Sequence, residues 1–363
     1  MSEKTIGEKS SPNKKHTDLK PDPAKRFLKT LNERWQENPL YSTGAVLIIM
    51  IIVQTFALGF NYPTFGDWFV NWGKNWINIL RNNAPVGIVA LGMAFVIISG
   101  GIDLAVGSTL VAVGAVMMVL INGNANGLLT AAGITGVPSF IIGILAALAM
   151  GALIGFINGF LVARSKLPAF IATLGMMKIC RSVTQQFMQT VGVKVPREFT
   201  AIANTQIGGE IILPIIYWIV IAAILVVVAR KTPFGRHVYA IGSNERAARL
   251  SGINVERVKT LVYVLSGALV AVAAVINIAR IGSMDYANAG SGYEMDAIAA
   301  VVVGGTSMSG GRGSIVGTVL GMLIIAVMNN LLNLIGVPPF LREAFKGLIV
   351  IVAVLLQKKD KAS

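Results

Sequence analysis

Apolar runs of about 20 residues recur along most of this 363-residue chain, and they constrain its fold more than any other feature. Each run is long enough to cross the hydrocarbon core of a bilayer, about 30 Å thick, as an α-helix. Helices satisfy their own backbone hydrogen bonds, which lipid cannot do. Only 13% of the residues are charged, about half the share in soluble domains. The sequence therefore predicts an all-α, polytopic membrane helical bundle that contacts lipid.

We predict about ten transmembrane helices, of which the second and eighth are short and discontinuous because glycines interrupt them. The expected spans are Thr43–Phe60, Ala84–Ile98, Ala105–Ile121, Phe140–Val162, Ala169–Val191, Ile211–Val228, Thr260–Ala279, Met295–Thr306, Ser314–Leu334 and Phe340–Leu356. The stretch Trp68–Leu80 carries three tryptophans and is expected to lie horizontally in the headgroup layer, where tryptophan is enriched. These spans form one domain, 41–358, between a polar basic segment, 1–40, and a short tail, 359–363.

The positive charge of the chain predicts its orientation in the membrane. The net charge is +14, but the basic residues lie between the spans and at the ends, so we expect no nucleic-acid partner. In the predicted topology 22 Lys and Arg fall on one side and five on the other. Loops rich in Lys and Arg stay in the cytoplasm, so both termini are expected there. Segment 1–40 is either a helix on the inner membrane surface or a basic flank that orients the first span.

A polar island, Arg230–Lys259, separates two of the long apolar runs. Within it, Ser243 or Asn244 can cap a short helix, and Gly252 can end that helix. This helix of about two turns carries no nucleophile, metal cluster or acid pair, and the charge bias places it in the cytoplasm. We interpret it as a docking site for another protein.

Glycines mark a weak internal repeat and two packing surfaces. At an offset of 210 residues, the break at Gly100–Gly101 aligns with the break at Gly310–Gly311, and each precedes an apolar helix. Discontinuous helices in matching positions are typical of transporters, although glycine-rich membrane helices also resemble one another by chance.

Glycines spaced by four residues predict close helix packing. They are Gly151, Gly155 and Gly159 in one span, and Gly313, Gly317 and Gly321 in another.

Polar side chains within the spans are costly in lipid, so by default they face a cavity or one another. Arg342, Glu343 and Lys346 are expected to satisfy one another near a helix end. Lys178 and Arg181 have no acid nearby in sequence, so they are candidates for a pathway or a buried pair. Amide side chains suit a hydroxyl-rich neutral solute, but they also tie helices together. The candidate substrate-pathway residues are Asn158, Thr173, Arg181, Asn329 and Asn330.

Enzymatic motifs are missing from the sequence. The turn Gly304–Ser314 fails the phosphate-loop pattern, because Gly311 stands where lysine is required. The two histidines do not form an H-E-x-x-H motif, and no G-x-S-x-G motif occurs. We therefore expect a chain that is not an enzyme and that binds no metal or cofactor.

Several segments resemble the membrane permease of bacterial ABC importers for monosaccharides, in its ribose-type branch. They are Gly100–Ser108, Leu167–Met177, Gly235–Asn254, Gly292–Thr318 and Asn329–Val337, and the resemblance extends from about Asn78 to Lys358. It implies a multi-pass permease of the bacterial inner membrane that pairs with a second copy. It also implies an ATPase subunit on a separate cytoplasmic chain, which uses the ATP, and an extracytoplasmic sugar-binding protein. Segment 1–40 is longer than the usual lead in this family.

In such permeases a short cytoplasmic helix sits in a groove of the ATPase. The resemblance implies that small Ala247 and Ala248 allow a close fit, and that Leu250 fills an apolar socket. The matching positions here are Gly242, Asn244, Glu245, Ala247, Ala248, Leu250 and Gly252. The function implied is import of a monosaccharide or small polyol by alternating access. The alternative is an ion-coupled secondary transporter, which the charged residues within the spans favour and which would not need the island.

Overall fold

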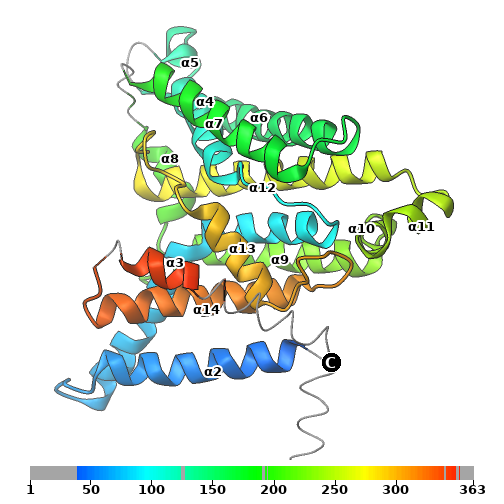
Figure 1. Cartoon of the computed structure of the whole chain (residues 1–363). Helices are drawn as coiled ribbons and strands as arrows, with labels where there is room; N and C mark the ends of the chain where they lie inside the picture. Colours follow the sequence, from blue (N-terminus) through cyan, green and yellow to red (C-terminus); the bar gives the residue numbers. More distant parts are fainter. Residues whose placement is uncertain are drawn as a thin grey trace, which may run out of the picture.

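The computed structural model describes residues 39–123, 127–189, 193, 195–338, 341–348 and 351. In this part of the chain the elements are helices, with one isolated bridge between Ile207 and Glu210. Six of these helices are long and apolar enough to cross a membrane. They are α2 (Pro39–Leu58), α3 (Phe65–Ile98), α6 (Val137–Ala163), α9 (Leu213–Lys231), α12 (Val255–Ile281) and α14 (Ile315–Leu334) (Figure 1). The predicted polytopic helical bundle is confirmed.

Seven further helices are described. They are α4 (Val106–Ile121), α5 (Leu128–Ala131), α7 (Ala169–Met188), α8 (Arg197–Asn204), α10 (Pro233–Ser243), α11 (Glu245–Leu250) and α13 (Tyr293–Val303). Helix α7 has 20 residues but is not among the six apolar helices, since Lys178 and Arg181 interrupt it. The predicted span Phe340–Leu356 lies largely outside the described residues, although 341–348 are helical. The surface helix considered for segment 1–40 also lies outside them.

The second predicted span and the tryptophan-rich stretch before it are not separate elements. They form one helix, α3, whose 34 residues begin after the cap Thr64. Pro85 lies inside α3, and the helix continues past it although proline removes one backbone hydrogen bond. The tryptophans anchor the start of α3 to the end of α2: the indole of Trp68 donates to the Gly59 carbonyl at 3.0 Å, and that of Trp72 to Thr55 at 3.1 Å. A separate horizontal segment was therefore the wrong prediction.

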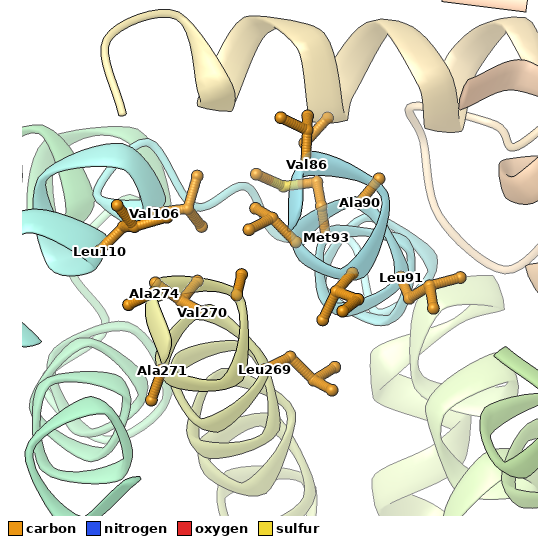
Figure 2. Packing of buried hydrophobic residues seen from close by; sticks show 14 of the residues in the cluster. Val86, Ala90, Leu91, Met93, Val106, Leu110, Leu269, Val270, Ala271 and Ala274 are labelled. Atoms are coloured by element: carbon orange, nitrogen blue, oxygen red, sulfur yellow. The ribbon is translucent and has the colours of Figure 1, made fainter. Parts of the chain in front are cut away.

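Helix α12 lies at the centre of the packing, against α6, α3 and α4. Figure 2 shows how α12, α3 and α4 meet through buried aliphatic side chains such as Val270, Met93 and Leu110. Burial of apolar groups does not by itself drive helices together in lipid, because lipid is equally apolar, so close fit between the helices decides their association.

The first set of spaced glycines, Gly151, Gly155 and Gly159, lies on the face of α6 that packs against α12. A Cβ atom at Gly159 would lie 2.8 Å from the Cα of Thr260, and one at Gly155 would lie 3.0 Å from the Cα of Val264. Gly267 of α12 faces Gly151 in turn, so that the two backbones meet directly. Any larger side chain at these glycines would force α6 and α12 apart.

The second set of spaced glycines, predicted at Gly313, Gly317 and Gly321, is only partly helical. Gly317 and Gly321 lie in α14 and pack on the backbone of α13, with a Cβ at Gly321 only 2.8 Å from the Gly304 nitrogen. Gly313 precedes the cap of α14, Ser314, and instead meets the Thr306 side chain and Ile98. Because α14 begins at Ile315, the predicted face of three helical glycines is shortened to two.

Candidate functional site

The polar island folds into two helices, α10 and α11, at the end of the molecule opposite α5 and α8 (Figure 1). Asn244 is the cap of α11, because its side-chain oxygen accepts from the Ala247 nitrogen at 2.9 Å. Ser243, the other candidate cap, is the last residue of α10. Gly252 ends α11 in the left-handed region at φ +83°, and its nitrogen donates to the Arg249 carbonyl. The predicted short helix and its stop at Gly252 are therefore present.

Ion pairs attach α11 to the first turns of α12. The Lys259 ammonium lies 2.6 Å from the Glu245 carboxylate, and the Arg249 guanidinium lies 2.6 Å from Glu256. Arg249 also approaches Glu245 at 3.6 Å. The hydrogen bond from Lys259 holds the pKa of Glu245 below its usual value, so this carboxyl is charged at neutral pH. Exposed ion pairs contribute little stability individually, but here they fix the orientation of a six-residue helix relative to α12.

The seven residues predicted to meet an ATPase do not all lie on one surface. Asn244, Glu245, Ala247 and Gly252 are exposed, and Leu250 is 85% exposed despite its apolar side chain. Ala248, by contrast, is only 5% exposed and packs into the core of the chain itself. Gly242 lies in α10 against the backbone of Ile98 and Gly311. A close fit of a partner against Ala248 is therefore excluded by the chain's own packing, and the exposed face centres on Ala247 and Leu250.

A pocket of about 390 Å³ lies beside this face. Its walls come from α10, from the turn after α11 and from the start of α12. The apolar lining residues include Phe234, Ile253, Val258 and Leu261. The basic side chains in the lining are His237 and Arg257. Residues from three elements form it, so no local sequence pattern could have revealed it.

The five predicted pathway residues are not brought together. The guanidinium of Arg181 donates to the carbonyls of Ala287 and Ala289, at 3.2 and 2.8 Å. The Thr173 hydroxyl donates to a carbonyl of its own helix. Asn330 exchanges hydrogen bonds with Asn75, and thereby ties α14 to α3. These three polar groups already have structural partners.

The two remaining pathway candidates are Asn158 and Asn329. Asn158 is 1% exposed, and its side-chain oxygen has no hydrogen-bond partner among the described residues. The same holds for the buried side-chain oxygen of Asn329. They belong to α6 and α14, which lie on opposite sides of α12 and α13 in Figure 1. Each therefore has free hydrogen-bonding capacity, but the two do not share a site.

Charged residues near the C-terminal end pair differently from the prediction. Lys346 bridges Glu343 at 2.9 Å, as expected, and also Asp296 of α13 at 3.0 Å. Arg342 donates to the Val337 carbonyl and takes no part in this bridge. The tertiary fold supplied the second acid, because Asp296 and Lys346 are 50 residues apart in the sequence.

Comparison with known proteins places the chain among transport permeases. Residues 75–354 match the family model described as branched-chain amino acid transport system / permease component. The ribose import permease protein RbsC of Escherichia coli K12 is 41% identical over 324 residues, which are 87% of this chain and 92% of that protein. RbsC of Bacillus subtilis 168 is 43% identical over 291 residues, covering 79% and 86%.

A third relative is named for a different sugar. The galactose/methyl galactoside import permease protein MglC of Haemophilus influenzae is 35% identical over 330 residues, 88% of this chain and 94% of that protein. No solved structure matches the chain. The family model covers well over half of the sequence, and the relatives align over nearly their whole length. The chain therefore belongs to the family of permease components of branched-chain amino acid-type transport systems.

Proposed function

We propose that this chain is the membrane permease of an ATP-driven importer for a monosaccharide or a similar small polyol. The observation that carries the proposal is the exposed helix α11, which presents Leu250 and is attached to α12 by the Glu245–Lys259 and Arg249–Glu256 ion pairs. In this proposal a separate cytoplasmic ATPase docks on α11. The ribose and galactoside permeases among the relatives support a sugar as the solute.

The attachment of α11 explains how work done by the ATPase would enter the membrane. Movement of α11 passes through the turn that follows it and through the ion pairs into α12, the central helix of the bundle. Such a bundle has two states, and the partners bias the balance between them. Contacts with the solute should be few and weak, because tight binding would slow its release.

Orientation and partners complete the proposal. The excess of Lys and Arg in the island and at both ends favours a cytoplasmic position for these segments in an inner membrane. An extracytoplasmic sugar-binding protein would deliver the solute and supply most of the specificity. A second copy of the permease would complete the pathway, and an ATPase subunit would dock on each copy.

The test is uptake into proteoliposomes that contain the permease with the ATPase and sugar-binding protein of the same transport system. Radiolabelled ribose, xylose and galactose are the probes. We expect ATP-dependent accumulation of one of them, and loss of both uptake and ATPase co-purification in Ala247→Trp. Leu145→Trp, at a 59% exposed position on α6, is the matched control and should behave like the parent. Enlarging the buried Ala248 would disturb the chain itself and is unsuitable.

Two outcomes contradict the proposal. One is Ala247→Trp retaining normal ATPase assembly and normal ATP-driven uptake. The other is uptake by the permease alone, driven by a proton or sodium gradient without ATP, which would support an ion-coupled transporter instead.

A further inference from the structure

The end of α10 meets two distant parts of the chain, backbone to backbone. A Cβ atom at Gly242 would clash with the Ile98 carbonyl and lie 2.5 Å from the Gly311 nitrogen. A Cβ at Gly311 would in turn lie 2.6 Å from the Cα of Ser243. The Tyr239 hydroxyl, on the same helix, donates to the Gly313 carbonyl at 3.0 Å. No side chain larger than hydrogen fits where these backbones meet.

The two parts that meet α10 are the glycine breaks of the internal repeat. The Gly311 nitrogen donates to the Ile98 carbonyl at 2.9 Å, which joins the turn before α14 to the end of α3. Gly310, at φ +81°, would carry a Cβ 3.1 Å from the Cα of Gly100, its counterpart in the repeat. We call this contact of Ile98, Gly100, Gly242, Gly310 and Gly311 the glycine junction. It links the island to both breaks at one point.

Helix α12 reaches the same region from the other side. The Tyr263 hydroxyl donates to the Ile102 carbonyl at 3.1 Å, and the Ser266 hydroxyl donates to the Asp103 carboxylate at 3.2 Å. Tyr263 and Asp103 are buried, at 1% and 4% exposure. The segment 99–105, which connects α3 to α4, is therefore held at its start by the glycine junction and further along by α12.

We infer that the island acts on segment 99–105 through two routes, and that the glycine junction is the second of them. The first route runs from α11 through the ion pairs to α12, and then to Ile102 and Asp103. The second runs from α11 into α10 through their shared residue Asn244, and then directly to Ile98. Both routes end on the break before α4, so this segment changes position when an ATPase moves α11. The inference rests on the proposed docking of an ATPase at α11.

The single cysteine of the chain, Cys180, reports on this segment without any engineering. It lies in α7, is 7% exposed, and its thiol is hydrogen-bonded to Thr109 of α4 and close to the charge of Asp103. The experiment measures the rate at which N-ethylmaleimide labels Cys180 in the assembled permease–ATPase complex in lipid nanodiscs. The rate is compared without nucleotide and after trapping with ATP and vanadate, and labelling is read by mass spectrometry of the permease.

Nucleotide should change the labelling rate in the parent complex, and Gly242→Ala should lose this response. Gly73→Ala is the matched control, because a Cβ there meets no atom within 4 Å, and it should respond like the parent. Co-purification of the ATPase is measured separately, so lost docking is distinguished from lost transmission. A parent complex that does not bind the ATPase would refute the proposed function and not the second route.

Either of two results overturns the inference. One is a parent complex that binds the ATPase but shows no nucleotide-dependent labelling. The other is a Gly242→Ala complex with the full response. If Gly242→Ala does not assemble, Tyr239→Phe decides the question. This variant removes only the hydrogen bond to Gly313, and we expect a reduced response, so an unchanged one counts against the second route.

Discussion

Leu250 offers the sharpest test of the docking surface. It is 85% exposed on α11, so almost the whole side chain is available for burial against a partner. Leu250→Ala removes three carbon groups, which are worth about 2.4 kcal/mol if docking buries them fully at roughly 0.8 kcal/mol each. Because each 1.4 kcal/mol is a factor of ten, we expect roughly a 50-fold weaker affinity for the ATPase.

The assay titrates purified ATPase against the permease in lipid nanodiscs and follows binding by biolayer interferometry. Leu145→Ala is the control, because it makes the same chemical change at a 59% exposed position on α6. The thermal stability of both variants should match that of the parent, since neither side chain packs in the core. An unchanged dissociation constant for Leu250→Ala would refute the assignment of α11 as the docking helix.

Three further predictions concern stability and pH. Gly155→Ala should overpack the contact between α6 and α12 and lower the unfolding free energy by about 1–3 kcal/mol in SDS titrations, whereas Gly175→Ala, with open space around its Cβ position, should not. Lys346→Met should destabilise the chain by about 3–5 kcal/mol, because it leaves the buried Asp296 without its cation, and adding Asp296→Asn should restore part of this loss in the same titrations. The lowered pKa of Glu245 means that its ion pair with α12 stabilises the island above the unfolded value of 4.5 and is lost as pH falls through the folded value. The protection factors of the α11 amides, which correct for the intrinsic pH dependence of exchange, should therefore fall in acid, and Glu245→Gln should remove that fall.

Hydropathy predicted most helices, because a bilayer requires long apolar segments. It did not predict where helices begin, or that two predicted elements form one helix. Helix α12 begins at Val255, before the predicted start at Thr260, because its charged first turn lies outside the apolar run. Similarly, the polar residues Arg81–Asn83 looked like a break between two elements. A helix continues as long as its backbone hydrogen bonds are made, so α3 runs without interruption through these three polar residues.

The local features of the candidate site were predictable, and its tertiary features were not. Asn244 and Gly252 act on neighbouring backbone groups, so spacing alone indicated where α11 begins and ends. Which of Ala247 and Ala248 faces the chain depends on how α11 sits against the core. The contact of Gly242 with Ile98 joins residues 144 positions apart, and no local pattern contains it.

The caps and ion pairs of α11 have a consequence for the free energy of assembly. A helix of six residues would not persist alone in water, because its nucleation is unfavourable and its length gives few hydrogen bonds in return. Here Asn244, Gly252 and the pairs to α12 preorganise it before any partner arrives. Association then requires little ordering of this surface, so the interaction energy goes into affinity rather than into folding the helix. A binding ATPase subunit would therefore contact a preformed helix instead of a flexible loop.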